Sequence, residues 1–424
     1  MNKSDQYIVI KNMLTLATGA GIGRLFGFFS IPVVTRIYSP ENMGVLSVFI
    51  AMIAILVPFG TLRYSVAIPL PKSNATALSL VTVCFFSLLV ITTSFGIALW
   101  LLPEEFFVVL SMEQLLPFWW LMPIVMFGVG LYEILNSWAT RKKEFRSIAK
   151  TQISQSISGA VVKIILGLYG LKPLGLLIGH AFSQAGGILL LLRIFWRSFR
   201  RKDISIRRLV FVLKRYSDFP RYRLFSQFLL IFSIQAPLLF SNFLYGKDVT
   251  GQLGLALSTL AMPISIFGNT TSQAYYAEIS RIGKNRPLDI FHVTKGIVKK
   301  LFWLSFPIFI ILFLFGSQLF ELAFGGQWQK AGFFSQILSL YLMAQFVSSP
   351  VVNVLSVFEK QAQFLFINLL RTLVVIAVFF SGYKYSLDYN KVIFIYSIFL
   401  SIHYFFTIIY IMYFLKLKVR RYNR

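Results

Sequence analysis

Cysteine, histidine and acidic residues are scarce in this chain of 424 residues. It has one cysteine, three histidines and 15 Asp or Glu, against 41 Lys or Arg. The single cysteine, Cys84, excludes a disulfide framework, and its apolar neighbours indicate a small buried hydrophobe. So few histidines and cysteines offer no metal-ligand cluster, and neither a phosphate-binding glycine loop nor a nucleophile triad is present in the sequence. The sequence therefore predicts no enzyme activity, no metal and no cofactor.

Apolar residues, by contrast, are in excess, at 57% of the sequence with a mean hydropathy of +0.73. Soluble domains are usually no more than about half apolar. Twelve runs reach about 20 residues, the length that crosses a bilayer as a helix. They fall near 13–34, 44–62, 76–102, 115–135, 151–171, 174–195, 223–244, 250–271, 301–321, 332–353, 363–382 and 392–415. The pattern predicts an all-α polytopic membrane protein with about 12 transmembrane helices.

A short signature recurs in the two halves of this hydropathy map. Tyr38, Glu41, Gly44 and Leu46 follow the first run, and Tyr245, Asp248, Gly251 and Leu253 follow the seventh at the same spacing. Internal repeats of this kind are common in transporters. We therefore expect an N-terminal six-helix bundle over 1–195 and a C-terminal six-helix bundle over 223–424. Between them, 196–222 is expected to be a basic, amphipathic cytoplasmic linker suited to phospholipid headgroups.

The basic residues are distributed unequally between the two sides of the membrane. In the loops and at the span ends that flank them, 32 Lys and Arg fall on the side of the amino terminus and six on the other. The positive-inside rule then predicts a multi-pass protein with both termini in the cytoplasm. The net charge of +26 is explained by this topology, so no nucleic-acid partner is expected. The outside loops are short, and none is large enough for an extracytoplasmic catalytic domain.

Three basic residues lie deep within the spans, away from their end turns: Arg24, Lys163 and Arg371. Arg24 is about 11 residues into its span, roughly 16 Å deep and near the bilayer midplane. A charge at that depth costs at least ~2.5–3.5 kcal/mol, so it normally faces a cavity or a partner. We expect these residues to form a cationic, substrate-binding lumen for an anionic cargo. Lys163 could instead pair with Glu133, and Arg371 could reach the cytoplasmic surface. Glycines beside Arg24 leave one helix flank open for packing or a ligand: Gly19, Gly21, Gly23 and Gly27.

Further polar residues complete the candidate site. Glu133 is the one acid clearly within a span, and with His180 it is a candidate for ion coupling, although His180 could equally be a packed polar residue. The polar lumen is expected to include Asn242, Asn269 and Gln273, some of which could serve only as interhelical contacts. At the cytoplasmic mouth we expect Arg63, Arg221 and Arg223, either collecting an anionic headgroup or anchoring the protein to bulk lipid.

The residues from Gly23 to Phe28, Tyr38 to Gly44 and Gly254 to Ser280 resemble the polysaccharide-exporter branch of the MOP transporter superfamily, in particular Wzx-type O-antigen flippases. The resemblance covers essentially the whole chain. It implies two six-helix bundles around a central cavity that work by alternating access. It also implies a flippase that moves an undecaprenyl-diphosphate-linked repeat unit across the bacterial inner membrane, from the cytoplasmic to the periplasmic leaflet. Arg24 matches the intramembrane arginine that relatives carry in the first span.

The expected partners are therefore a lipid-linked oligosaccharide and membrane lipids, with a glycan polymerase and chain-length machinery as further partners. Two other functions are alternatives to this one. A multidrug or cation antiporter of the same superfamily would need acids rather than bases in its lumen. A membrane-embedded glycan polymerase would need a long extracytoplasmic loop to carry its catalytic groups, and the sequence has none.

Overall fold

The computed structural model describes residues 3–109, 111–199, 205–263 and 268–422. This part of the chain is almost entirely helical, and no strand occurs within it. It forms two compact units, residues 1–235 and 236–424. The prediction of an all-α polytopic membrane protein is confirmed, because nine helices within the described ranges are long and apolar enough to cross a bilayer.

The first unit contains the helices that run from the amino terminus to the start of a long helix shared with the second unit. They are α1 (Lys3–Ile37), α2 (Pro40–Gly60), α3 (Asn74–Leu101), α4 (Glu104–Val109), α5 (Leu121–Arg141), α6 (Phe145–Leu168), α7 (Leu174–Ala185), α8 (Ile188–Ser198) and α9 (Ile206–Arg215), with short turns η1 (Tyr64–Ala67), η2 (Glu113–Phe118) and η4 (Phe219–Arg223). The break between α7 and α8 falls at Gly187, whose φ of 99° a residue with a side chain would rarely adopt.

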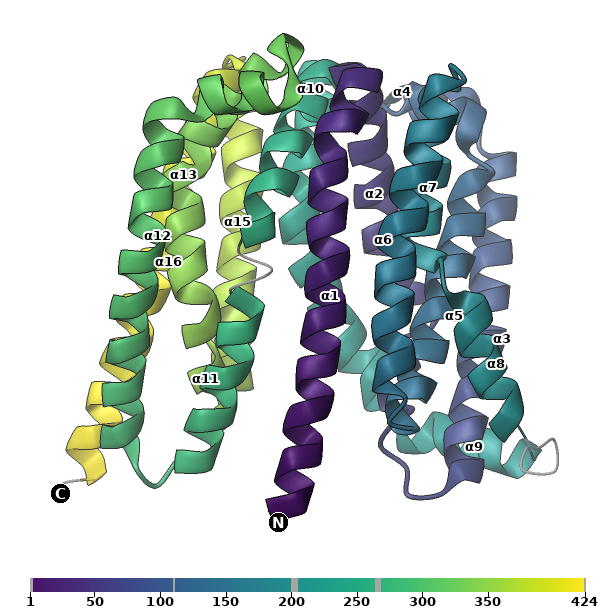
Figure 1. Cartoon of the computed structure of the whole chain (residues 1–424), viewed down its shortest axis with the longest axis vertical. Helices are drawn as coiled ribbons and strands as arrows, with labels where there is room; N and C mark the ends of the chain where they lie inside the picture. Colours follow the sequence, from purple (N-terminus) through teal and green to yellow (C-terminus); the bar gives the residue numbers. More distant parts are fainter. Residues whose placement is uncertain (1–2, 110, 200–204, 264–267, 423–424) are drawn as a thin grey trace. The chain divides into compact units, whose positions relative to one another are not determined.

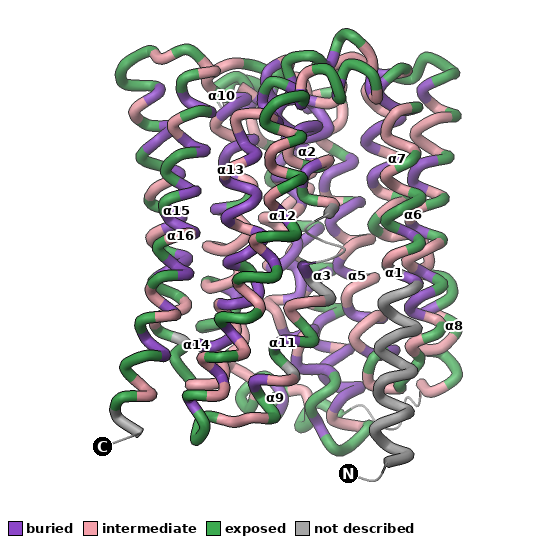
Figure 2. The backbone as a smooth tube through the Cα atoms, turned by 60° about the vertical axis from the view of Figure 1, so that its left-hand side comes forward, coloured by how far each residue is buried: buried purple, intermediate pink, exposed green. Residues whose placement is uncertain are grey.

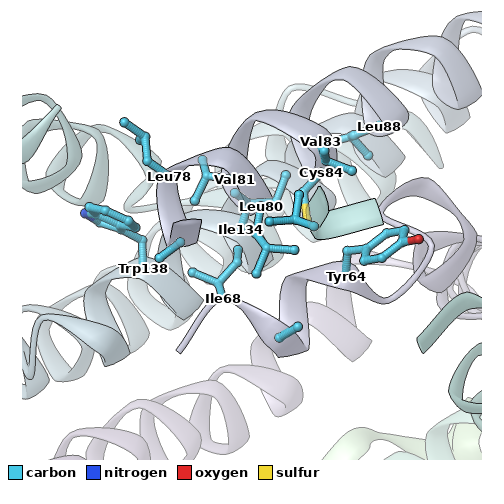
Figure 3. Packing of buried hydrophobic residues seen from close by; sticks show 13 residues of the cluster. Tyr64, Ile68, Leu78, Leu80, Val81, Val83, Cys84, Leu88, Ile134 and Trp138 are labelled. Carbon is cyan, nitrogen blue, oxygen red and sulfur yellow. The ribbon is translucent and has the colours of Figure 1, made fainter. Parts of the chain in front are cut away.

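A buried apolar cluster holds one end of this unit together (Figure 3). It joins η1, α3 and α5, with the side chains of Ile68, Cys84 and Trp138 almost fully enclosed. Val212 of α9 belongs to the same cluster and is 0% exposed. The segment expected as a surface linker is therefore partly fixed against α3. The basic residues Arg207 and Arg208 remain exposed on it, whereas residues 200–202, which carry its other basic cluster, lie outside the described part.

Within the first unit, the start of α1 and the helix α9 lie at the same end (Figure 1). The amino terminus and the basic segment are both predicted to be cytoplasmic from the distribution of Lys and Arg. If both are cytoplasmic, they have to lie at the same end of this unit, as they do.

The second unit contains most of the long kinked helix and the remaining helices. They are α10 (Leu224–Pro263), α11 (Asn269–Ile282), α12 (Pro287–Phe324), α13 (Gln329–Val351), α14 (Asn353–Val357), α15 (Gln361–Lys384) and α16 (Tyr389–Tyr422), with the turn η6 (Gly326–Trp328) before α13. α13 packs against both α12 and α16. Its apolar window is 67% buried, whereas that of α12 is 11% buried, a contrast that Figure 2 shows in the purple α13 and the green and pink α12. α13 is thus the interior helix of this unit, and α12 presents most of its surface outward.

Within the described residues, each of the twelve predicted runs coincides with helix, but the count of twelve spans stays a prediction. One of the nine apolar helices covers Phe219–Met262, which takes in two predicted runs, and neither α1 nor α6 is among the nine. The two runs are separated inside α10 at Gly246, where φ is 78° and ψ is −178°. This glycine lets the chain turn between them.

The repeated tyrosines occupy matching positions in the two units. The Tyr38 hydroxyl donates to the carbonyl of Lys163 in α6 at 2.7 Å, and the Tyr245 hydroxyl donates to the carbonyl of Leu387 after α15 at 2.9 Å. Each tyrosine lies over a glycine, because an added Cβ at Gly167 would be 2.7 Å from the Tyr38 ring and one at Gly382 would be 3.1 Å from the Tyr245 hydroxyl. The internal repeat therefore includes a shared tyrosine bond between the first corner and the fifth span of each unit.

We expect Tyr38→Phe and Tyr245→Phe to destabilise the protein by similar amounts. Each change removes one hydrogen bond to a backbone carbonyl, which lowers the unfolding free energy by about 0.5–1.5 kcal/mol. Burial also raises the pKa of Tyr38 to about 12, so this phenol stays protonated and able to donate at any physiological pH. Chemical unfolding in detergent micelles measures the effect, with Tyr222→Phe as control because Tyr222 is 71% exposed. Equal stability of all three variants would contradict a structural role for the two tyrosines.

Candidate functional site

Arg24 lies on α1 next to the surface through which α1 packs against α6. Two glycines make that close contact possible: an added Cβ at Gly19 would be 2.5 Å from the Ala149 Cβ, and one at Gly23 would be 3.0 Å from the Gln152 carbonyl oxygen. Gly21 and Gly27 have nothing within 4 Å of an added Cβ. The glycines near Arg24 therefore form two surfaces of α1. Gly19 and Gly23 pack against α6, and Gly21 and Gly27 border open space.

The Arg24 side chain is exposed. It follows Gly23 by one residue, which turns it about 100° away from the contact with α6 in a helix of 3.6 residues per turn. An exposed guanidinium near the predicted midplane of a membrane helix is unfavourable against lipid, and it is favourable beside water or an anion. The exposed position of Arg24 is compatible with the predicted interaction with a charged ligand, which stays a prediction.

A cavity of about 170 Å³ lies within the first unit among α1, α2, α6 and α7. Its lining includes one charged residue, Lys163, and three serines, Ser30, Ser156 and Ser183. Each serine hydroxyl donates to a carbonyl of its own helix, at 2.6, 3.2 and 2.7 Å, which leaves the oxygen able to accept hydrogen bonds. With about 30 Å³ for each water, the cavity has room for a few waters and is too small for an oligosaccharide.

Lys163 reaches this cavity over a glycine of α7. An added Cβ at Gly179 would be 2.3 Å from the Lys163 Cγ and 3.0 Å from the Lys163 backbone nitrogen. Among the described residues, the Lys163 ammonium forms no ion pair and no hydrogen bond within 3.5 Å. The packing of α6 on α7 thus places a positive charge beside the part of α1 that holds Gly27, one turn from Arg24.

We expect Gly179→Ala to destabilise the first unit, because the new methyl group collides with Lys163. Overpacking of this kind costs about 1–3 kcal/mol of unfolding free energy. Gly21→Ala is the matched control, since it also adds one methyl group to a membrane helix but meets nothing within 4 Å. Thermal unfolding in detergent should separate the two variants. If Gly179→Ala were as stable as Gly21→Ala, the position of the Lys163 side chain would not depend on the missing side chain at Gly179.

Glu133 is paired with Arg63, so the alternative of a Lys163–Glu133 pair is wrong. The Arg63 Nη1 donates to the Glu133 Oε1 at 3.0 Å, and the Ser65 hydroxyl donates to the same oxygen at 2.8 Å. The depths explain the difference, because Glu133 lies at the level of the turn after α2, whereas Lys163 lies in the cavity beyond it. The carboxylate is thereby neutralised within the first unit.

His180 is enclosed in α7, with 6% of its surface exposed. Its ring meets Phe49 edge to face, with the ring centroids 6.3 Å apart. It is not in contact with Glu133, whose hydrogen-bond partners are Arg63 and Ser65. Two residues proposed together for ion coupling therefore lie in separate environments, and the packing of His180 matches that of a polar residue in a helix interface.

Arg371 lies inside the second unit rather than at its surface, which contradicts the expectation that it could reach the cytoplasmic boundary. Only 8% of it is exposed, and its Nη1 donates to the Tyr404 hydroxyl at 3.2 Å. The Tyr404 ring lies 5.8 Å from that of Tyr341, which in turn lies 5.8 Å from that of Tyr396. Phenol dipoles from α13 and α16 surround the guanidinium, so Arg371 contributes positive charge to the interior of its unit.

The other predicted residues are divided between surface and interior. Arg221 and Arg223 are exposed at η4, as expected of a mouth or an anchor. Gln273 is exposed, whereas Asn242 is 2% exposed and belongs to the interior of the second unit. The side chain of Asn269 lies outside the described residues. The described residues contain no group of three or more His, Cys, Asp or Glu that could hold a metal.

Sequence reasoning missed the serines around Lys163 and the role of Gly179. Ser156 and Lys163 are seven residues apart and Ala160 lies between them, so their common face of α6 was readable from the helical period. The cavity residues Ser30 on α1 and Ser183 on α7 were not predictable, because nothing in the sequence shows which faces of the three helices meet.

A family model described as "Polysaccharide biosynthesis protein" matches residues 33–332. The chain belongs to this family. No curated protein matches the sequence. The family match confirms the resemblance to polysaccharide exporters stated from the motifs.

Solved structures share the fold at low sequence identity. The lipid II flippase MurJ in an inward closed conformation is 14% identical, with 95% of this chain and 87% of that chain covered and a TM-score of 0.74. An inward-facing multidrug resistance MATE transporter of the MOP superfamily is 14% identical, with 95% and 96% covered and a TM-score of 0.64. A MOP superfamily transporter from Pyrococcus furiosus is 15% identical, with 98% and 96% covered and a TM-score of 0.65. The chain is thus a polysaccharide biosynthesis protein whose fold is shared with solved MATE and MurJ structures.

Proposed function

We propose that the protein is a flippase for an anionic, lipid-linked oligosaccharide. In this proposal it moves an undecaprenyl-diphosphate-linked O-antigen unit, or a similar repeat unit, from the cytoplasmic to the periplasmic leaflet of the bacterial inner membrane by alternating access of its two units. The observation that carries the proposal is Arg24, an exposed guanidinium at mid-depth of α1 in a polysaccharide biosynthesis protein.

The charges of the described helices support an anionic cargo. Lys163 and Arg371 add two interior cations, and the Arg371 guanidinium donates to a neutral phenol, the Tyr404 hydroxyl, at 3.2 Å. Glu133, the acid predicted within a span, is already paired with Arg63 at 3.0 Å. A lumen for organic cations would need unpaired acids, so the charges argue against a multidrug antiporter although MATE transporters share the fold. For the Pyrococcus furiosus protein, too, a reversed pocket polarity is taken to suggest a different function.

The membrane potential supplies a driving force for such a cargo. A sugar diphosphate cannot cross hydrocarbon unaided, because burying unpaired polar and charged groups costs many kcal/mol. A positively charged, hydrated path removes that barrier, and an inside-negative potential favours outward movement by about 2.3 kcal/mol per charge per 100 mV. Two diphosphate charges would gain on the order of 5 kcal/mol. Neutralisation of Glu133 by Arg63 agrees with a cycle that needs no coupling cation at that residue.

Sidedness and partners belong to the same proposal. Both termini would lie in the cytoplasm, with Arg221 and Arg223 at the cytoplasmic mouth and the basic residues of α9 at the headgroups of the inner leaflet. A glycan polymerase and chain-length machinery would act on the product in the periplasm.

Transport in proteoliposomes tests the proposal. The purified protein is reconstituted with a fluorescent undecaprenyl-diphosphate oligosaccharide, and a membrane-impermeant quencher reports the fraction in the outer leaflet. We expect protein-dependent movement that an imposed negative-inside potential accelerates in the direction of the positive side. Matched vesicles with an organic dye cation serve as the second arm. Accumulation of the dye without movement of the lipid would overturn the proposal in favour of an antiporter.

A further inference from the structure

A groove of about 780 Å³ runs along the second unit between α12, α13 and α16. These three helices are neighbours in the fold, and α12 and α16 both pack against α13 (Figure 1). The groove is lined by phenylalanines from each helix together with a few polar residues. Phe309 and Phe313 come from α12, Phe333 from α13 and Phe394 from α16.

The polar groups along the groove wall are already satisfied by the protein. The Gln336 amide nitrogen donates to the Phe313 carbonyl at 3.1 Å, and its oxygen accepts from Ser317 at 2.9 Å. The Ser397 and Ser339 hydroxyls donate to backbone carbonyls of α13, each at 2.6 Å. The amide and hydroxyl donors of Gln336, Ser339 and Ser397 are thus engaged within the protein, and the exposed phenylalanines of the groove favour a hydrocarbon chain.

Positive charge lies at one end of the groove only. Lys391 and Asn390 line it in the first turn of α16, at the boundary predicted to face the periplasm. Lys391 is exposed and forms no ion pair within 4.0 Å among the described residues. Asp388 lies nearby, but its carboxylate accepts from the Asn390 backbone N–H at 3.0 Å and caps the helix. An ammonium and an amide at the end of a hydrocarbon groove suit a lipid with a phosphate headgroup.

A row of stacked phenylalanines extends the groove along α12. The ring centroids of Phe302, Phe306, Phe309 and Phe313 follow one another at 5.7, 6.2 and 5.7 Å. The row from Phe302 to Phe313 spans 11 residues of α12, roughly 16 Å at 1.5 Å per residue. This is about half of a hydrocarbon core roughly 30 Å thick. The row therefore gives a lipid chain an aromatic surface over the depth of about one leaflet.

We propose that the groove between α12, α13 and α16 binds the polyprenyl chain of the lipid-linked cargo, with the diphosphate beside Lys391 once it has reached the outer leaflet. This inference rests on the proposed function and adds a site for the part of the cargo that never leaves the bilayer. The row from Phe302 to Phe313 keeps the chain on one surface of the unit while the headgroup crosses.

Photo-crosslinking tests the site without requiring transport. The full-length protein in nanodiscs is exposed to undecaprenyl diphosphate carrying a photoreactive terminal isoprene, and modified peptides are identified by mass spectrometry. We expect labels on α12, α13 and α16 that excess undecaprenyl diphosphate removes. Phosphatidylglycerol at the same concentration should compete at least tenfold less well.

Two variants of different kinds keep the test decisive. Leu340→Trp fills the groove, with Leu322→Trp as its control because Leu322 is 80% exposed elsewhere on the unit. Lys391→Glu reverses the charge at the rim, with Lys384→Glu as its control at the same end of the unit. We expect a fivefold or greater loss of labelling in Leu340→Trp and Lys391→Glu, and less than twofold in the controls.

The outcomes separate this inference from the proposed function. Equal competition by phosphatidylglycerol, or labelling that Leu340→Trp and Lys391→Glu leave unchanged, would overturn the groove while transport of the oligosaccharide stood. The opposite result is also informative. If the groove is labelled as expected but the protein does not move the oligosaccharide, the lipid site is supported and the flippase function is overturned.

Discussion

Replacement of Arg24 by alanine is expected to reduce glycan export at least about 100-fold. The guanidinium can donate two parallel hydrogen bonds to a phosphate, and each charge-assisted bond contributes about 1.5–3 kcal/mol, where 1.4 kcal/mol is a factor of ten. The exposed position of Arg24 on α1 means that its removal opens no hole in the packing against α6, which depends on Gly19 and Gly23. Arg24→Ala should therefore reach the membrane at the native level, and the loss should lie in transport.

The conservative variant distinguishes charge from geometry. Arg24→Lys keeps the positive charge but loses the planar fork, so we expect about a tenth of native export. Arg36→Ala is the matched control, since Arg36 is also exposed on α1 but lies in its last turn. Initial rates in the proteoliposome assay, normalised to reconstituted protein, provide the measurement. Native rates in Arg24→Ala would remove this residue from the cargo path.

The helices and the repeat were predictable because both depend on local patterns. Apolar run lengths place helices at each predicted position, and the spacing of Tyr38 and Tyr245 reflects two corners that are built in the same way. The hydrogen bonds to Lys163 and Leu387 are between residues 125 and 142 positions apart. Such partners are set by which helix faces meet, and a single sequence carries no record of that.

The same limit explains the errors in the candidate site. Depth along a span predicts Arg24 as a residue that needs a polar neighbour, because depth follows from counting residues, and this stays a prediction. Arg371 was predicted to be shallow by the same count, but α13 and α16 cover it with Tyr341 and Tyr404. Glu133 was matched with the nearest interior base by sequence, whereas its partner Arg63 belongs to a turn that folds back onto α5.

The turn after α2, which carries Arg63, gives the largest expected effect on stability. After α2, Leu62 and Arg63 adopt φ values of 47° and 60°, which residues with side chains rarely do. The strain is held by neighbours, because Thr61 and Ser65 are 0% exposed and lie 3.2 Å apart through their hydroxyl oxygens. This geometry directs Arg63 at Glu133, and only 15% and 25% of the two side chains are exposed. A strained turn is thus held in place by a nearly buried ion pair.

We expect Glu133→Ala to lower the unfolding free energy by about 2–4 kcal/mol. Breaking a buried pair from one side costs about 3–5 kcal/mol because a charge is left without compensation, and partial exposure reduces that figure. Arg63→Ala should cost less, since the Ser65 hydroxyl still donates to the remaining carboxylate. The double variant should be more stable than the sum of the two losses implies, with a coupling of about 1–3 kcal/mol. Chemical unfolding of the four proteins in one detergent completes the cycle.

A glycine at position 63 separates the ion pair from the strain. Arg63→Gly loses the guanidinium as Arg63→Ala does, but glycine adopts a φ of 60° without the steric cost of about 1 kcal/mol or more that alanine pays. Arg63→Gly should therefore be the more stable of the two by roughly that amount. Equal stabilities would mean that the turn relaxes when the pair is lost, and the ion pair would then be the cause of the strained conformation rather than its result.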